Sequence, residues 1–543
     1  MQMSTSPAPQ EIPPPQPPQP PQPPTGGGRA LFGWLLLIVP LVALVYAYVL
    51  PTLRAIDEST RSGSGFGAEG APVGGENYSK LFGDQAFLEG VLTYGLVALG
   101  SALSGAVVAF LVAWCVHLAG RGVRLAGRII AVLAALSFAP LAWTVALKAD
   151  EFERFTEPGS QMAEAVSLSS WVAIASGTVF GIGLLVGLAA FRGGADTGRR
   201  VGTVLAAAGL TGLAILAAGL QAYTFSALTG LRPTSPLAHV YGISFRNADF
   251  GLGQAASVAV LVPLALLGLA AAFLVIGARV RIDIAPGPEQ PRPFRAGPGI
   301  GAIVLLALFA TGTLMTLWPW LSRIGDGSAE PYESGTVLSN TWGTALVTTG
   351  IGFAAALAGA IAIGTLRPLG DKSLWLLLPF APWLFVGSGP LALSNYMGLR
   401  DAEDYGTYMS LAPRAWIAVP ALFLLTALFW GLENRRRAML NEGWSPGAAG
   451  ATLFRAGWPL AALVGLAVLV ANGQDSYWQS LTGLPDQPNA WVAMVSNLTS
   501  LMNFDAGFGV GVGYPVAIFL PLAVAAVAAA IWYLPRVAIH IGK

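Results

Sequence analysis

RVRIDIAPGPEQPRPFRAGPG, residues 279–299, divides the chain into two parts of similar length. The stretch holds four arginines and five prolines, and long apolar runs lie on both sides of it. Charged side chains are costly inside a bilayer, and proline removes a backbone hydrogen-bond donor, so this stretch is not expected to cross a membrane. It predicts a polar linker between two membrane-embedded halves.

The composition indicates a membrane protein. The 543 residues are 54% hydrophobic and only 10% charged, whereas soluble domains carry about 25% charged residues. Apolar runs recur at about the 20-residue length that a helix needs to cross ~30 Å of hydrocarbon. We therefore expect an all-α polytopic membrane protein with about twelve transmembrane helices in two six-helix halves.

The expected organisation follows the apolar runs. Residues 1–30 form a disordered, proline-rich tail, 31–278 the first half, 279–299 the linker and 300–543 the second half. The expected spans are 31–51, 88–116, 125–147, 166–191, 201–221, 252–278, 300–320, 340–366, 374–394, 412–432, 458–472 and 509–535. Small residues at helix-packing spacing, Gly177/Gly181 and Gly183/Gly187, predict close helix contacts.

The N-terminal tail carries PPPQPPQPPQPP at 13–24, which favours extended polyproline II structure and buries no core. It is interpreted as a disordered tail or as a ligand for a proline-binding domain. The tail is too polar and too long for the start of a signal peptide, so the first apolar run is expected to remain as an anchor.

The basic residues predict the orientation. Most of the 29 lysines and arginines fall on the side of the linker, including Arg121, Arg124, Arg128, Arg199, Arg200 and Arg435 to Arg437, and most acidic residues fall on the other. Cytoplasmic loops are enriched in lysine and arginine. We therefore expect a multi-pass protein of the cytoplasmic membrane with both termini in the cytoplasm and an acidic outer face.

Enzyme motifs are missing from the sequence. It contains no GxxxxGK[ST], GxSxG or HExxH, one cysteine and three histidines, so we expect no catalytic residue, cofactor or metal site. The net charge of +1 does not indicate a nucleic-acid partner. The expected spans carry no Asp, Glu or Lys at their centres, whereas proton-coupled carriers usually need an intramembrane carboxylate. Energy for transport would then come from another subunit.

Two stretches of the first half resemble the permease subunits of sugar-type (maltose-like) ABC importers. The run 31–53 with Arg54 is similar to their first helix. Matching positions follow at Gly75, Asn77, Tyr78, Leu81, Phe82, Asp84 and Phe87, and at Phe225, Leu228, Thr229, Gly230, Pro233, Thr234, Tyr241, Phe245, Phe250, Gly251 and Ala255. The second half resembles the partner permease in 338–364, in the proline-containing run 376–389 and in the basic terminus PRVAIHIGK.

The family's ATPase-coupling loop, a Glu-Ala-Ala followed by Gly and then Leu-Pro, is altered here. The second half offers Arg437, Ala438, Met439, Leu440, Glu442, Gly443, Trp444 and Pro459, but it lacks the leading acid and has a longer spacing to the proline. The first half offers only FRGGADTGRR at 191–200, in which Arg199 and Arg200 would make a weaker, secondary contact.

The resemblance implies two permease halves fused in one chain, with a type I-like importer fold. Its partners would be the bilayer, ATP-binding subunits in two copies, an extracytoplasmic solute-binding protein and a sugar or similar small polar solute. Solute contacts are expected from polar and aromatic residues at the outer helix ends: Gln221, Tyr223, Asn395, Tyr396, Gln474 and Trp478. Their rings and amides suit a sugar, and simple interfacial anchoring is the competing role.

Two alternatives remain open. A twelve-helix secondary carrier has the same outline, with a basic loop between two sets of six helices. A lipid-dependent membrane enzyme would use acidic loops such as 150–153 or 401–404, which are otherwise read as solvated loop charges.

Overall fold

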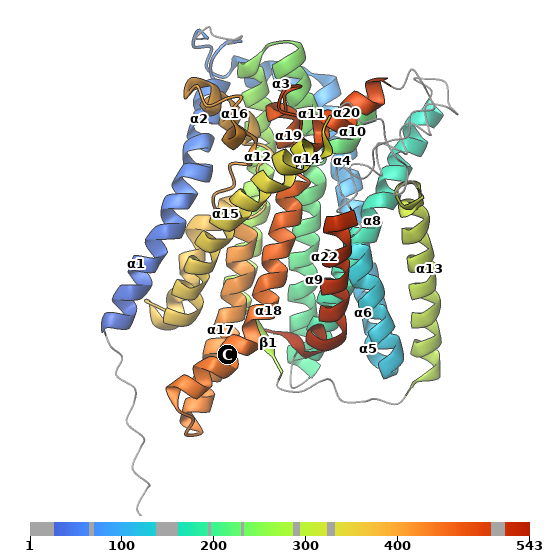
Figure 1. Ribbon diagram of the computed structural model, residues 1–543, viewed down its shortest axis with the longest axis vertical. Coiled ribbons are helices and arrows are strands. Elements are labelled where there is room, and N and C mark those ends of the chain that lie inside the picture. The colour runs from blue at the N-terminus through green and yellow to red at the C-terminus, as the bar shows by residue number, and fades with distance from the viewer. Residues whose placement is uncertain are drawn as a thin grey trace, which may run out of the picture.

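The computed structural model describes residues 27–63, 70–136, 161–193, 197–229, 233–285, 294–322, 332–500 and 516–542. Long helices run roughly parallel along the molecule, and short helices and loops cap one end of them (Figure 1). We call this the loop end; it holds α3 (Glu76–Gly83), α11 (Pro236–Tyr241), α16 (Ala392–Asp401) and α19 (Ser476–Thr482). The opposite end, which we call the sheet end, holds β1 (Arg281–Ile284) and β2 (Val537–His540).

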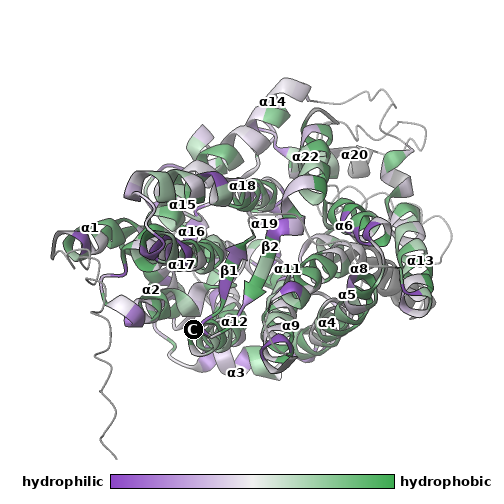
Figure 2. Ribbon diagram, turned by 90° about the horizontal axis from the view of Figure 1, so that it is seen from below, coloured by the Kyte–Doolittle hydropathy of each residue, from purple (hydrophilic) through white to green (hydrophobic). Residues whose placement is uncertain are grey.

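Within the described residues, eight helical segments are long and apolar enough to cross a membrane. They are Gly28–Ser59, Gln85–Leu118, Gly198–Leu228, Phe250–Ala278, Ala296–Trp318, Ser334–Leu366, Pro446–Gly473 and Ile518–Arg536. Hydrophobic residues cover much of the peripheral helices when the bundle is viewed from the sheet end (Figure 2). The chain is thus a mainly helical, polytopic membrane protein, and the number twelve stays a prediction.

Several of these segments combine more than one helical element, and others are a single helix. In the first half the elements are α1 (Gly27–Leu44), η1 (Val45–Val49), α2 (Leu50–Ser59), α4 (Gln85–Leu103), η2 (Ser104–Val108), α5 (Ala109–Leu118), α9 (Thr197–Leu220), α10 (Thr224–Thr229) and α12 (Phe250–Ala278). In the second half they are α13 (Ala296–Leu321), α14 (Ser334–Leu338), η4 (Ser339–Gly343), α15 (Thr344–Ala360), η5 (Ile361–Leu366), α18 (Pro446–Gly473), α22 (Val516–Ala528), η8 (Ala529–Tyr533) and η9 (Leu534–Arg536).

Three more helices complete the bundle: α6 (Arg121–Leu136), α8 (Gln161–Arg192) and α17 (Val419–Asn441). The expected span 125–147 is described only as far as its part in α6. Side-chain caps start several helices, because the first N–H groups of a helix lack partners within it. Asp84 accepts from the Ala86 N–H at 2.9 Å at the start of α4, and Asp249 accepts from the Leu252 N–H at 3.0 Å at the start of α12.

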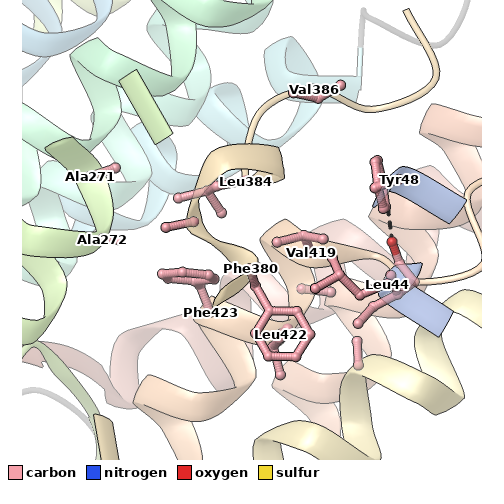
Figure 3. Close-up of a cluster of buried hydrophobic side chains, with 14 of the residues drawn as sticks. Leu44, Tyr48, Ala271, Ala272, Phe380, Leu384, Val386, Val419, Leu422 and Phe423 are labelled. Carbon is pink, nitrogen blue, oxygen red and sulfur yellow. Dashed lines mark hydrogen bonds between the residues drawn. The ribbon is translucent and has the colours of Figure 1, made fainter. Parts of the chain in front are cut away.

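The expected span 374–394 is not one continuous α-helix. Residues Gly370–Trp383 form a 3₁₀ helix, η6, and the chain re-enters an α-helix only at Ala392 in α16. Pro379 and Pro382 lie inside η6, where each removes a backbone donor and disfavours α-helical hydrogen bonding. The segment instead fills the centre of the molecule, where Phe380 and Leu384 pack beside Leu422 and Phe423 (Figure 3).

The first helix of each half packs on the other half. Helix α1 contacts α15 and η5, whereas α13 contacts α5, α6 and α8. Tyr48 of η1 donates a hydrogen bond to the Ile417 carbonyl oxygen at 3.3 Å (Figure 3), and the Trp383 indole donates to the Thr52 hydroxyl at 3.1 Å. The two halves are therefore interlocked rather than simply placed side by side.

The linker contributes a strand that the sequence did not predict. Strand β1 pairs antiparallel with β2, with Arg281 opposite His540 and Ile284 opposite Val537. The pair packs on α17 so closely that a Cβ at Gly431 would lie 2.2 Å from the Ile282 carbonyl oxygen. The start of the linker, the C-terminal segment and α17 thus form one unit, which we call the clasp.

Candidate functional site

Polar side chains join the two halves at the loop end. Gln221 of the first half donates its amide to the Phe385 carbonyl oxygen at 2.7 Å. The Tyr223 hydroxyl donates to Ser480 Oγ at 2.9 Å, and the neighbouring Thr224 and Ser476 hydroxyls are hydrogen-bonded at 2.5 Å. These bonds hold the ends of α9 and α10 against the segment around α19.

A chain of aromatic rings runs through the same interface. Tyr223 lies 4.6 Å from Tyr477 and 5.5 Å from Trp491, measured between ring centroids. Tyr241 packs against Phe245 at 5.1 Å, and Phe245 packs edge-on against Tyr396 at 5.2 Å. Rings from both halves therefore pack against one another across this interface, where Tyr223, Tyr396 and Tyr477 are buried.

Four buried side-chain oxygen atoms of η3 (Gly242–Arg246), α12 and α19 have no hydrogen-bond partner among the described residues. They belong to Ser244 of η3, to Gln254 and Ser257 of α12, and to Tyr477 of α19. The amide nitrogen of Gln254 reaches Met397 Sδ of the other half at 3.3 Å, while its Oε1 is unpaired. A buried polar atom without a partner costs about 1–3 kcal/mol, so such atoms commonly mark a functional site or bound water.

Asp475 lies at the edge of this interface. Its carboxylate accepts hydrogen bonds from the Ser388 hydroxyl and, at 3.1 Å, from the Trp478 N–H, which caps α19. Burial raises the pKa of Asp475, and these two hydrogen bonds oppose the shift. Burial also raises the pKa of Tyr477 well above its usual value.

The predicted pathway residues separate into three groups. Gln221, Tyr223 and Tyr396 lie at the interface of the halves. Asn395 on α16 and Gln474 at the end of α18 are half-buried beside it. Trp478 differs, because its ring is fully buried within the second half and its indole donates to the Leu411 carbonyl oxygen at 3.1 Å. Trp478 therefore has a structural role in the described chain.

Gln254, Ser257 and Tyr477 are not among the residues that the sequence predicts for the pathway, because they are neither charged residues within a span nor among the polar residues predicted at the outer helix ends. Gln254 and Ser257 form an i, i+3 pair near the start of the otherwise apolar α12, which places them on one face of that helix. In the sequence, these two residues can be recognised as an amide side chain three residues before a hydroxyl side chain within an apolar run.

The sheet end is organised by a buried carboxylate. The Glu433 side chain is 0% exposed and accepts from Arg29 at 2.8 Å, Arg436 at 2.7 Å and Arg437 at 3.1 Å. Arg367, which follows η5, contacts the same part of α17. Its guanidinium carbon lies 3.6 Å from the centroid of the Trp430 ring, and its guanidinium donates a hydrogen bond to Asn434 Oδ1 at 2.8 Å. These contacts fasten the start of α1 and the end of η5 to α17.

The predicted coupling segment has a different form from the expected short helix. Arg437, Ala438, Met439 and Leu440 continue α17, Glu442 to Ser445 make a turn, and Pro459 lies inside α18. Gly443 has a φ of +91°, which glycine adopts without strain, and Pro446 follows in the first turn of α18. A helical hairpin of α17 and α18 results, and its tip extends beyond the neighbouring helices at the sheet end (Figure 1).

The apolar side chains of this hairpin differ in exposure. Met439 is only 7% exposed and packs inward, whereas Trp444 is 47% and Phe454 73% exposed. Arg199 and Arg200 are exposed at the start of α9. Among the predicted coupling residues, Trp444 thus offers an exposed apolar surface, and Met439 does not.

No group of histidine, cysteine or carboxylate side chains in the described part of the chain is arranged to hold a metal ion. No family model, curated protein or solved structure matches the chain.

Proposed function

We propose that the chain is the membrane subunit of an ABC importer, in which two fused permease halves form a pathway for a sugar or similar polar solute. The observation that carries this proposal is the set of unpaired buried oxygens and aromatic rings between two interlocked, apolar halves. Transporters built from two related halves commonly bind solute at the interface between them.

The lining favours a neutral, hydroxyl-rich solute. Gln254 Oε1 and the Ser244, Ser257 and Tyr477 hydroxyls are uncharged hydrogen-bonding groups. The apolar faces of a sugar ring pack well on aromatic side chains such as Tyr223 and Tyr396. A charged solute would face no fixed opposite charge on these groups.

Gln254→Met is expected to reduce solute uptake about tenfold while leaving thermal stability unchanged or raised. The variant removes an amide that would hydrogen-bond the solute, and it also removes an unpaired buried oxygen. Uptake of a panel of labelled neutral sugars and the melting temperature of the purified chain measure the two effects.

Gln479→Met is the matched control. The Gln479 amide donates to the Gly473 carbonyl oxygen at 2.9 Å within the second half, so this change should lower stability without altering solute preference. Wild-type uptake by Gln254→Met, or altered preference in both variants, would contradict the proposed pathway.

The motor subunits are proposed to dock at the tip of the α17–α18 hairpin. Exposed aromatic anchors dominate many protein interfaces, and Trp444 and Phe454 are two such side chains at the sheet end. A rigid hairpin that is tied to α1 and η5 through Glu433 and Arg367 transmits movement into the bundle.

Replacing Trp444 and Phe454 together by alanine is expected to release the ATP-binding subunit or to uncouple hydrolysis from transport. Replacing Arg199 and Arg200 together by alanine should have a smaller effect. Purification of the tagged chain from its native cells, with identification of any ATP-binding subunit that comes with it and an ATPase assay in liposomes, tests this. Retention of a fully coupled motor by the double aromatic variant would rule out this docking surface, and no associated ATPase at all would overturn the importer proposal.

One observation favours a secondary carrier instead. Asp475 is a carboxylate with a raised pKa at the interface of the halves, which is the setting of a proton-coupling group. Uptake by the isolated chain in liposomes with an imposed proton gradient distinguishes the carrier from the importer. Gradient-driven uptake that is lost in Asp475→Asn would support the carrier, whereas uptake that requires ATP and a second subunit supports the importer.

A further inference from the structure

A cavity of about 450 Å³ opens in the clasp at the sheet end. It lies between β1, β2 and α17 and is lined by Arg281, Asp283, Ile284, Ala285, Gly431, Asn434, Arg435, Ala538 and His540. The volume is within the range of small-molecule sites, which run from about 300 to 1,000 Å³. It is separate from the interface at the loop end.

The charge of this clasp groove is predominantly positive. The guanidinium groups of Arg281 and Arg435 face one carboxylate among the described residues, that of Asp283. Burial lowers the pKa of the His540 imidazole, so this ring is not counted as a positive charge. Asp283 lies 3.3 Å from Arg281 Nε and 3.6 Å from His540 Nε2. Arg435 makes no ion pair among the described residues, so its charge is not neutralised by a direct carboxylate contact.

The surroundings add to this excess. Arg436 and Arg437 follow Arg435 directly, and together with Arg29 they share Glu433 as their carboxylate partner. Arg435 is held in place by a hydrogen bond to the Ile284 carbonyl oxygen, and Asn434 by its bond from Arg367. Both side chains are therefore positioned before any ligand arrives, which lowers the entropic cost of binding.

We propose that the clasp groove binds the phosphoryl group of a small organic phosphate. Arginine presents paired N–H donors that match phosphate oxygens, and the Asn434 amide nitrogen supplies a further donor. The cavity is larger than a phosphate ion requires, and Asp283 in its lining is suited to accept hydrogen bonds from hydroxyl groups of the organic part.

The bound phosphate would bridge three segments that are far apart in the sequence. Strand β1 continues from α12 of the first half, α17 belongs to the second half, and β2 is held to α8 by a hydrogen bond from Arg192 to the Val537 carbonyl oxygen at 2.8 Å. Occupation of the groove would thus favour the arrangement in which β1 and β2 pack on α17. A cytoplasmic phosphorylated metabolite would in this way set the population of that arrangement.

The purified full-length chain tests this through ligand-induced shifts of its melting temperature. Glucose 6-phosphate is the probe, with glucose and sodium sulfate at equal ionic strength as comparisons. We expect glucose 6-phosphate to raise the melting temperature, and the double variant Arg281→Gln/Arg435→Gln to weaken its apparent affinity at least tenfold. The double variant Arg121→Gln/Arg455→Gln, which removes two exposed arginines outside the groove lining, should bind like the wild type.

Asp283→Asn keeps the test valid if the arginine variant does not fold, because it removes the negative charge from the groove and should tighten phosphate binding severalfold.

Nanodiscs of phosphatidylglycerol or phosphatidylcholine distinguish the source of the phosphoryl group. A groove-dependent shift that needs phosphatidylglycerol and not glucose 6-phosphate would assign the site to a lipid headgroup and overturn the metabolite. The absence of any groove-dependent shift, or equal loss in both double variants, would overturn the site itself.

Discussion

Gly183→Ala is expected to lower the free energy of unfolding by about 2 kcal/mol, within the range of overpacking in well-filled interiors. A Cβ at Gly183 of α8 would lie 2.0 Å from the Gly105 carbonyl oxygen and 2.9 Å from Ala109 Cβ. The oxygen belongs to the backbone, so the added methyl group forces the two helices apart. Thermal unfolding of the detergent-purified chain measures the loss.

Gly100→Ala is the matched control for this change. Gly100 also lies within a membrane helix, α4, but a Cβ there would meet no atom within 4 Å. Alanine favours a helix over glycine by about 1 kcal/mol, so the control should be neutral or stabilising. Equal melting temperatures for the two variants would show that α8 and η2 do not approach as closely as the structure has them.

The small-residue pattern was one part of the packing that could be predicted from the sequence. Gly181 and Gly187 make similarly close approaches, to the Ala131 carbonyl oxygen at 2.5 Å and to Ala113 Cβ at 2.8 Å. Small residues in apolar runs predict that helices meet, and the structure confirms this for Gly181, Gly183 and Gly187. The pattern cannot predict which helices meet, because lipid-facing and protein-facing surfaces are almost equally apolar.

The exchange of α1 and α13 between the halves shows this limit. Both runs were found from their length and hydropathy, but their partners depend on side-chain shape over the whole bundle. The break in the span 374–394 is a different case, because its cause can be read from the sequence. Pro379 and Pro382 lie within it, although the resemblance predicts a proline-containing helix there. Two prolines within so short a run favour an interruption over a continuous α-helix.

The candidate site was partly predictable for a related reason. Gln221, Tyr223 and Tyr396 were chosen as polar or aromatic residues at outer helix ends, and the structure places them at the interface of the halves. Trp478 meets the same criterion, but its position three residues past the cap Asp475 turns its ring into the second half. Residue type and position along a span do not determine the direction of a side chain.

Glu433→Gln is expected to lower the free energy of unfolding by about 3 kcal/mol, the order found when one partner of a buried ion pair is removed. Glu433 accepts hydrogen bonds from Arg29, Arg436 and Arg437, and its own side chain is fully buried. The neutral amide leaves the three guanidinium groups without their counter-charge. Its NH₂ group also faces the N–H donors of these arginines, with which it cannot form a hydrogen bond. Glu442→Gln, an exposed carboxylate in the hairpin turn, should change the melting temperature little.

The arginine partners should matter less than the carboxylate that they share. Arg29 is 41% exposed and Arg437 49%, so water partly solvates both, and Glu433 retains two partners when either is replaced by glutamine. We expect each of these variants to lose less than half of what Glu433→Gln loses. Arg29→Gln should also increase protease access to the start of α1, since the hydrogen bond from Arg29 to the Thr365 carbonyl oxygen at 2.8 Å is lost as well. A loss from Arg29→Gln as large as that from Glu433→Gln would mean that the attachment of α1, and not the buried charge, is what stabilises this end of the molecule.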